Sequence, residues 1–311
     1  MSETESIQDL PGVGPVSVEK LITHGFDTML SIAVSSPAQI ADASGLSEPK
    51  ARTIIQAARN ALNFNFTTAF DEKRTREKEV FKIPTGSTKL DGILDGGFES
   101  GIISETFAKF GAGKSQIAHQ LCVNIHKLDP AFKAIYIDTE HSFRPERIDE
   151  MAREAGLDSD KILKNVIKTN VFNSDHQMFM VEQTEGLIKK DKNIKLLIVD
   201  SIIDHFRHEF PGRGQLADRQ HKLNKHLHFL AKVAKLYNVV VYVTNQVMDD
   251  PGLMYGDPVK AAGGNIVGHI CQTRLYLRRS QKGVTAKVID APNLAPAEAI
   301  FQITKEGIRD E

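Results

Sequence analysis

The 311-residue sequence predicts an α/β protein with a mainly parallel sheet, preceded by a small all-α domain. Short apolar runs that end in polar residues alternate with helical stretches in the larger part of the chain, and the clearest runs are 133–138, 195–200 and 239–245. Near-continuous apolar strands of this kind are typical of a parallel sheet covered by helices on both faces, with a binding site at the carboxyl ends of the strands. Residues 1–60 instead carry apolar residues at helical spacing behind two glycine turns.

The predicted N-terminal domain, residues 1–60, begins with the turn Leu10-Pro11-Gly12-Val13-Gly14, and a weaker copy follows at Ser44-Gly45-Leu46-Ser47. The segment resembles a helix-hairpin-helix DNA-binding domain, in which Gly12 and Gly14 would expose backbone N–H groups to a DNA phosphate. A helical packing unit without a ligand would show the same spacing and stays open as the alternative.

Residues 61–80 form a predicted linker, because the charged run 71–79 favours solvent. Phenylalanines just ahead of this run need a pocket to enter, so Phe66-Thr67-Thr68-Ala69 is a candidate tether. The alternative is that Phe66 closes the core of the small domain, and the spacing does not decide between the two.

A phosphate-binding loop lies near the start of the predicted α/β core, residues 81–311. Gly111-Ala112-Gly113-Lys114-Ser115 stands between an apolar run and a helical stretch. The backbone N–H groups of such a loop surround the β- and γ-phosphates of a nucleotide, Lys114 reaches them as a point charge, and the Ser115 hydroxyl takes one place on Mg²⁺. The common pattern has glycine where this chain has Ala108. A helix start that merely carries a lysine is the alternative for this motif alone.

Carboxylates follow two of the predicted strands. Asp200 comes after four apolar residues, a position from which it can hold Mg²⁺ directly or through water beside Ser115. A lone Asp at this place can be a helix cap, but its occurrence together with the loop favours the metal role. Glu140, two residues past Asp138, can polarise the water that attacks the γ-phosphate, and Gln246 follows the third run. Phosphoryl transfer depends mainly on positioning and charge neutralisation, so these groups suffice in outline.

The composition limits the partners and the compartment. With 39 Lys and Arg against 40 Asp and Glu, any binding of nucleic acid must come from local patches. Cys122 and Cys271 lie far apart without metal-ligand spacing, which favours a reduced intracellular protein with buried thiols. No segment approaches the ~18 apolar residues of a membrane span, and the first residues lack the pattern of a leader. We therefore expect a soluble, cytoplasmic protein without membrane contact.

With these residues located, the chain resembles the archaeal recombinases of the RecA family of DNA strand-exchange ATPases over essentially its whole length. The motifs that carry the resemblance are residues 10–14, 85–87, 90–91, 110–116, 138–140, 143–147, 173–177, 205–207, 212–214, 244–248, 256–258 and 290–292. This resemblance implies a RecA-like P-loop ATPase core that binds ATP and Mg²⁺.

The resemblance also implies roles at the ATP site. Lys114, Glu140 and Gln246 correspond to catalytic residues, with Glu140 as the catalytic carboxylate and Gln246 as the sensor of the γ-phosphate. Asp200 and Ser115 correspond to the metal site. The implied nucleotide contacts are Phe110, Gly111, Ala112, Gly113, Lys114, Ser115, Gln116, Arg147, Asp290 and Pro292.

Among these contacts, Arg147 corresponds to an arginine that stacks on adenine. Asp290 and Pro292 correspond to a cap that one subunit supplies to the ATP of its neighbour. Asp290 is also implied as a ligand for a monovalent cation such as K⁺.

For DNA, the resemblance places Arg207, Arg213 and Arg219 in a first DNA-binding loop. Arginines among glycines suit phosphates, although each is otherwise a solvated surface charge. Residues 247–268 correspond to a second loop, in which Gly264 and Asn265 approach the DNA backbone.

The candidate tether has a counterpart in the family as well. Phe66 and Ala69 resemble a segment that enters the core of a neighbouring subunit and builds a helical filament or ring. The chain departs from the family pattern at Ala108, Lys109, His141, Ser142, Asn170, Asp249 and Asp250.

The function implied is an ATP-dependent recombinase of an archaeal-type, nucleoid-associated kind. It would polymerise on single-stranded DNA, exchange strands with double-stranded DNA in recombination and repair, and work with mediator proteins. A regulatory paralogue that exchanges strands poorly is one alternative, and a non-enzymatic DNA-binding or filament-capping protein is another. The presence of both the hairpin domain and the tether favours the recombinase.

Overall fold

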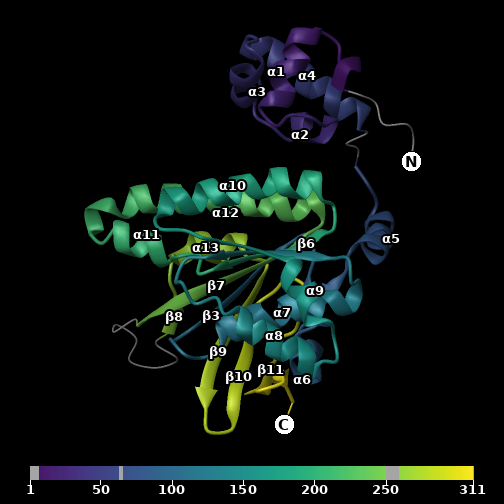
Figure 1. Ribbon diagram of the computed structural model, residues 1–311. Helices are drawn as coiled ribbons and strands as arrows, with labels where there is room; N and C mark the ends of the chain where they lie inside the picture. Colours follow the sequence, from purple (N-terminus) through teal and green to yellow (C-terminus); the bar gives the residue numbers. More distant parts are fainter. Residues whose placement is uncertain (1–6, 63–65, 250–258, 311) are drawn as a thin grey trace. The chain divides into compact units, whose positions relative to one another are not determined.

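The computed structural model describes residues 7–62, 66–249 and 259–310, and the chain divides into two compact units, residues 1–77 and 78–311 (Figure 1). The described part of the first unit is helical, and the second unit holds the strands. This arrangement confirms the predicted combination of a small helical domain with an α/β core. Among the described residues, no helix has both the length and the apolar character needed to cross a membrane.

The N-terminal unit consists of short helices around an apolar core. Its elements are η1 (Ile7–Asp9), α1 (Pro15–Thr23), α2 (Met29–Ala33), α3 (Pro37–Ser44) and α4 (Glu48–Ala61). Thr28 and Ser36 each start a helix with a reciprocal capping box, which satisfies N–H groups that a helix start leaves unpaired. Gly45 ends α3 with a left-handed φ of 71°. Leu21, Ile32 and Ile54 are fully buried between these helices.

Residues 61–80, the predicted linker, contain the helix α5 (Ala69–Glu79). The prediction from the sequence does not include this helix. None of its residues is buried. Ion pairs one turn apart, such as Lys73–Glu77 at 3.7 Å, help a charged sequence to form an isolated helix, although each contributes only a few tenths of a kcal/mol. Because α5 is helical, the segment between the units is stiffer than a charged coil.

A ten-stranded sheet forms the centre of the core unit, in the order β12-β11-β10-β9-β3-β7-β6-β4-β5, with β8 paired to β7. Neighbouring strands from β9 to β5 run parallel, whereas β10, β11, β12 and β8 join antiparallel. The strands are β3 (Ile103–Ala108), β4 (Lys133–Asp138), β5 (Val166–Asn170), β6 (Ile194–Asp200), β7 (Val240–Asp249), β8 (Val259–Ala261), β9 (Thr273–Ser280), β10 (Gly283–Asp290), β11 (Glu298–Thr304) and β12 (Gly307–Arg309). A separate ribbon pairs β1 (Lys82–Ile83) with β2 (Phe98–Glu99).

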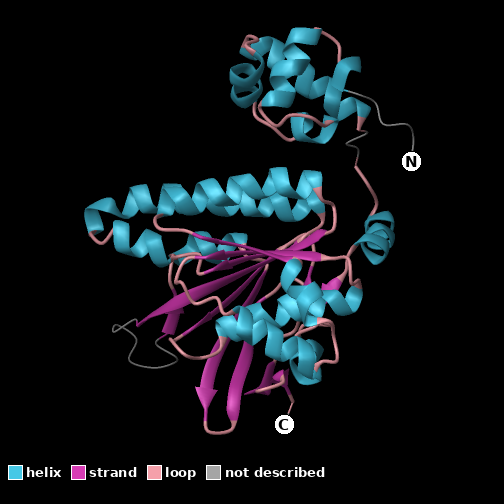
Figure 2. Cartoon of the chain, in the orientation of Figure 1, coloured by secondary structure: helices cyan, strands magenta, loops and turns pink. Residues whose placement is uncertain are grey.

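Helices cover both faces of this sheet (Figure 2). Alternate residues of a strand face opposite sides, so Ile135 and Ile137 of β4 join one apolar layer while Ala134 and Tyr136 join the other. The layer of Ile135 includes α10 (Ser174–Lys190), α12 (Leu216–Tyr237) and α13 (Gly264–Ile270), next to α11 (Asp204–Glu209) and η2 (Arg213–Gln215). The layer of Tyr136 includes α6 (Thr88–Ile93), α7 (Lys114–Leu128), α8 (Pro145–Glu154) and α9 (Ser159–Lys164). Cys122 and Cys271 are buried and unpaired, as predicted.

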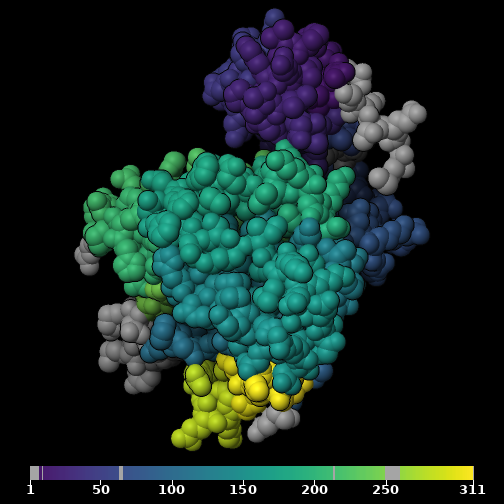
Figure 3. Space-filling view, viewed as in Figure 1, coloured from purple at the N-terminus to yellow at the C-terminus, as the bar shows by residue number. Residues whose placement is uncertain are grey.

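In the space-filling view, atoms of the C-terminal residues lie directly against atoms of earlier residues of the core unit (Figure 3). Strand β11 contacts α6, and β12 contacts α7. Arg147 of α8 donates to the backbone carbonyls of Thr304 and Lys305, the latter at 2.7 Å. Asp310 accepts from the backbone N–H of Thr88 at 2.8 Å and caps α6. These contacts tie the C-terminal segment to α6 and α8 of this helical layer.

Two predicted boundaries are wrong. The third apolar run continues as a strand to Asp249, so Gln246 lies inside β7 rather than after it. The predicted second DNA loop, residues 247–268, includes the end of β7, all of β8 and the start of α13. Polar side chains at positions 244–246 hide this strand, because the sequence pattern of a strand stops where apolar residues stop. Asp250 lies outside the described residues.

Candidate active site

The predicted phosphate loop connects β3 to α7, which begins at Lys114. Gly111 and Gly113 have φ values of 76° and 108°, which favour glycine. A Cβ atom at Gly113 would also lie 2.5 Å from Cδ1 of Ile303. Ala108 is not among the residues with positive φ and lies within β3, so its methyl group causes no backbone strain. The loop thus keeps glycine at both of these left-handed positions despite its departure from the glycine pattern at Ala108.

Lys114 is buried beside a cavity of about 320 Å³. Its Nζ makes one hydrogen bond within the described chain, a long one of 3.4 Å to the carbonyl oxygen of Ala108. Burial lowers the pKa of this ammonium, and the charges of Glu140 and Asp200 oppose that shift. An ammonium has three donors, so Lys114 retains donors for an anion. The lining of the cavity comprises Ala108, Lys109, Phe110, Lys114, Glu140, Gln246 and Val247.

Asp200 ends β6 and is almost completely buried. Its Oδ2 accepts a 2.6 Å hydrogen bond from the hydroxyl of Tyr136, and its Oδ1 accepts from the hydroxyl of Thr244. Burial and the adjacent Asp200 charge raise the pKa of Tyr136 well above its ordinary value, so this phenol remains a donor. Both oxygens of Asp200 are therefore held in place by neighbouring strands.

Glu140 follows β4 in a loop that is fixed by its neighbours. Asp138 accepts from the backbone N–H groups of Ser142 at 3.0 Å and Phe143 at 3.2 Å. Nε2 of His119, on α7, lies 3.3 Å from the backbone N of Arg144 and accepts from it. Burial lowers the pKa of His119 to about 4, which keeps the imidazole neutral and able to accept. The loop that carries Glu140 is thus tied to β4 and to the helix that follows the phosphate loop.

Gln246, another of the predicted catalytic residues, contacts Glu140. Its Nε2 donates to Oε1 of Glu140 at 3.0 Å and to Oδ1 of Asp204 at 3.2 Å. Its Oε1 accepts from Nη1 of Arg207 at 2.8 Å. The backbone register pairs Gln246 with Ala108, which places its side chain at the level of the phosphate loop.

Arg147 lies beside the phosphate loop but is already engaged. Its Nε donates to Oε1 of Gln116 at 2.8 Å, and its Nη1 pairs with Glu150. The first of these hydrogen bonds connects two residues that are predicted to contact the nucleotide, Gln116 and Arg147.

Asp290 and Pro292 are exposed and are not brought to this site. The sheet register pairs Asp290 with Arg274, and Arg274 with Glu105, three residues before the end of β3 at Ala108. Asp290 therefore lies away from the phosphate loop of its own chain.

The predicted DNA residues of the core differ in their surroundings. Arg207 contacts Gln246, whereas Arg219 is half-buried on α12 and its Nε has no hydrogen-bond partner among the described residues. Gly264 and Asn265 are exposed at the start of α13. Arg213 lies in η2, but its side chain is outside the described part of the structure.

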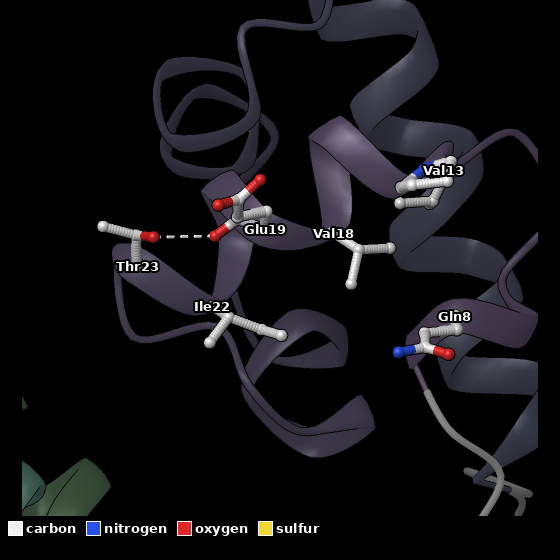
Figure 4. Close-up of a pocket in the computed structure, with 7 residues that line it drawn as sticks. Gln8, Val13, Val18, Glu19, Ile22 and Thr23 are labelled. Carbon is white, nitrogen blue, oxygen red and sulfur yellow. Dashed lines mark hydrogen bonds between the residues drawn. The ribbon is translucent and has the colours of Figure 1, made fainter.

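The glycine turn of the N-terminal unit leads directly into α1. Gly12 has a φ of 83°, and Gly14 is the N-cap of α1, where it makes no side-chain capping hydrogen bond to the first turn. A separate cavity of about 410 Å³ lies next to this turn, lined by Gln8, Val13, Pro15, Val18, Glu19, Ile22 and Thr23 (Figure 4). Its lining is mainly apolar, and the hydroxyl of Thr23 already donates a hydrogen bond to the backbone carbonyl of Glu19 at 2.8 Å. The cavity therefore does not resemble a phosphate site.

Phe66 is fully exposed, with a relative accessibility of 108%. This finding excludes the alternative that Phe66 closes the core of the small domain. Ala69 begins α5 and is also exposed.

Sequence reasoning misses Tyr136, Thr244 and Asp204, which hold Asp200 and Gln246. Tyr136 and Thr244 interrupt apolar runs with hydroxyl groups, and the parallel register aligns Asp138 with Asp200. A search for polar residues near the strand ends would have found the first two. Asp204 has no such signal, because the helix that carries it follows an irregular turn.

Comparison with known proteins gives a family model for each unit. A model described as Rad51 matches residues 76–311, and a model described as a SAM-like helix-hairpin-helix tandem matches residues 4–60. Over 313 residues the chain is 47% identical to the DNA repair and recombination protein RadA of Aeropyrum pernix, and the match covers 99% of this chain and 98% of that protein. The chain therefore belongs to the Rad51 family of strand-exchange recombinases.

Proposed function

We propose that this chain hydrolyses ATP in response to DNA, forms a filament on single-stranded DNA and exchanges strands with a homologous duplex in an archaeal-type cytoplasm. The observation that carries the proposal is the convergence of Lys114, Glu140 and Gln246 on one cavity beside a loop with left-handed glycines. Hydrolysis of a nucleoside triphosphate needs a fixed cation for the phosphates, a polar group for the attacking water and a sensor of the terminal phosphate. These three residues supply one group for each need.

Lys114 is the cation of this site. Its ammonium is buried with one weak acceptor, so phosphate oxygens would replace missing hydrogen bonds and balance its charge. The left-handed Gly111 and Gly113 allow the backbone to turn its N–H groups toward the same phosphates. Gln116 and Arg147 would meet the base and sugar, once Arg147 gives up part of its contact with Glu150.

The residues present fit Mg²⁺ bound largely by substrate oxygens. The described residues contain no group of three or more His, Cys, Asp or Glu that could hold a metal alone. Mg²⁺ prefers one or two protein oxygens together with phosphates and waters, and it would neutralise the charge that develops on them. Ser115 supplies a hydroxyl in the first turn of α7, and Asp200 supplies a carboxylate. Because both oxygens of Asp200 already accept from hydroxyls, we infer that Asp200 acts through a bound water.

Glu140 is the group that orients the attacking water. It is half-buried at the cavity, and within the described part of the chain one of its oxygens accepts a hydrogen bond from Gln246. Gln246 can hold Glu140 or a terminal phosphate with the same nitrogen, which suits a sensor.

The exposed Asp290 and Pro292 suit a cap for the ATP of a neighbouring subunit, because they lie away from the loop of their own chain. Asp290 would there also be available to a monovalent cation such as K⁺. This role requires the subunits to stack in a filament.

The filament is supported by two exposed elements. Phe66 is fully exposed, and β5 forms an edge of the sheet with Ile167 38% exposed. An extended segment such as 66–68 can add to a free edge strand while its side chains enter apolar pockets. We propose that Phe66 and Ala69 anchor one subunit on the edge of the next.

DNA would contact three places. The turn at Gly12 and Gly14, where no side chain caps the start of α1 within the described residues, suits duplex phosphates. Arg207, Arg213 and Arg219 belong to the successive elements α11, η2 and α12, and Gly264 and Asn265 lie at the exposed start of α13.

An assay of strand exchange tests the proposal. The full chain, ATP, Mg²⁺, a single-stranded oligonucleotide and a labelled homologous duplex should yield a displaced strand, whereas a heterologous duplex should not. Binding of DNA with ATP hydrolysis but without displacement would instead support the regulatory paralogue. The assay contains no mediator proteins, so any strand exchange that it detects is an activity of this chain alone.

A further inference from the structure

Arg207 connects a predicted DNA-binding segment to the ATPase centre. It lies on α11, and its Nη1 donates to Oε1 of Gln246 at 2.8 Å. A carboxamide has an acceptor end and a donor end, and a guanidinium can only donate. The bond therefore determines that the oxygen of Gln246 faces Arg207 and that its nitrogen faces away.

The nitrogen of Gln246 contacts two carboxylates, Glu140 at 3.0 Å and Asp204 at 3.2 Å. Arg207, Gln246 and Glu140 thus form a continuous row of hydrogen bonds. All three side chains are half-buried, where polar contacts are screened less than they are at the surface. In this arrangement one oxygen of Glu140 is occupied by a protein donor.

The helix that carries Arg207 is anchored independently of this row. Glu209, also on α11, accepts from the backbone N–H of Ser174 at 2.6 Å, at the start of α10. The guanidinium of Arg207 is therefore held next to Gln246 before any DNA is bound.

We infer that Arg207 is a positioning residue of the ATPase centre, and that a DNA phosphate which binds Arg207 weakens its hold on Gln246 and frees Glu140 for the attacking water. The inference rests on the proposed function, because it needs DNA at Arg207 and hydrolysis at Glu140. A phosphate oxygen forms a stronger, charge-assisted hydrogen bond with a guanidinium than an amide oxygen does. A phosphate can therefore compete with Oε1 of Gln246 for the same donors.

The test compares Arg207→Met, Arg207→Lys and a control in the full chain. Methionine has similar length without a donor, and lysine keeps a cation that can donate to Gln246 or to DNA. Lys225→Met is the control, because it removes another cation, one on α12 that is 67% exposed and pairs with Glu182 at 3.8 Å. ATP turnover is measured with and without an oligothymidine, and affinity for a fluorescent, non-hydrolysable ATP analogue is measured under the same two conditions.

For Arg207→Met we expect DNA-independent turnover to rise by about fivefold or more, the lower end of ordinary coupling between two sites. The ratio of stimulated to basal turnover should fall by the same factor, and the oligonucleotide should no longer change affinity for the analogue. Arg207→Lys should keep part of the stimulation, and Lys225→Met should behave like the parent. Thermal unfolding verifies the fold, and Arg207→Lys carries the test if methionine prevents folding.

A basal rate in Arg207→Met that is unchanged or lower, with normal stimulation at saturating DNA, would overturn the inference and leave Arg207 as a DNA contact only. If the parent chain shows no ATP turnover in the presence of DNA, both the proposed function and the inference about Arg207 are overturned. The two failures are thus distinguishable, because only the second appears in the parent.

Discussion

At the scale of single residues, the candidate phosphate loop departs from its usual pattern at Ala108, a position that has no left-handed φ. Ala108 ends β3, is buried and has no positive φ, while the left-handed positions Gly111 and Gly113 keep their glycines. A missing glycine matters only where the backbone needs a left-handed φ or close approach. Sequence alone cannot separate these cases at Ala108, because φ there depends on the strand into which it folds.

Ala108→Gly should therefore change affinity for ATP by less than about tenfold, or roughly 1.4 kcal/mol. The local φ already suits alanine, so glycine relieves no strain. Titration with a fluorescent ATP analogue gives the affinity. A gain of a hundredfold or more would mean that the alanine impairs nucleotide binding.

Tyr136→Phe tests the support of Asp200 at the same scale. Removal of one hydroxyl leaves Oδ2 of the buried carboxylate without its 2.6 Å donor, which should cost roughly 1–3 kcal/mol of unfolding free energy. It should also change the Mg²⁺ concentration needed for half-maximal binding of the ATP analogue.

Tyr242→Phe is the matched control, because this buried hydroxyl donates to the backbone carbonyl of Lys114 at 3.3 Å and not to Asp200. It should reduce stability without changing the Mg²⁺ requirement. Equal Mg²⁺ requirements in both variants would show that Tyr136 does not support a metal ligand.

At the scale of elements, the strands with apolar runs were predictable and their polar ends were not. Residues 133–138 and 195–200 fold as β4 and β6 with almost the predicted bounds, because burial on both faces demands apolar side chains. The extension of β7 through Gln246 escapes this pattern, since its polar residues are satisfied by long-range contacts such as Asn245 with Glu105 at 2.6 Å. The register that joins Gln246, Glu140 and Arg207 likewise has no local signal.

The packing of α10 against α12 carries a buried histidine with a consequence for pH. His226 is buried near Gln177, and burial lowers its pKa from the ordinary 6.5 to about 3. The folded state binds fewer protons than the unfolded state below pH 6.5, so the stability from the neutral ring is complete above 6.5 and is lost as pH falls toward about 3.

His226→Gln should make the melting temperature fall less steeply between pH 6.5 and 4 than it does in the parent, because glutamine stays neutral throughout. His208→Gln, whose imidazole is 76% exposed, should retain the slope of the parent. Identical slopes in all three proteins, measured by thermal unfolding, would show that His226 does not report on acid stability.

At the scale of the whole molecule, the tether and the sheet edge predict assembly. Phe66→Glu should yield a folded monomer, since a carboxylate in an apolar pocket of a neighbour costs about 2 kcal/mol or more, while on an exposed segment it costs little. Phe70→Glu is the control, because Phe70 is 67% exposed on α5 and has no assigned pocket. Light scattering gives the oligomer and circular dichroism the fold. Persistence of the oligomer in Phe66→Glu would refute the tether.

The central claim is that DNA binding and ATP hydrolysis meet in one chain, and turnover of ATP with and without single-stranded DNA tests it most directly. The parent should hydrolyse ATP faster when the oligonucleotide is present, and Lys114→Ala should show background turnover under both conditions because the phosphates lose their fixed cation. Equal turnover in the parent and in Lys114→Ala, or a parent rate that DNA does not raise, would contradict the account.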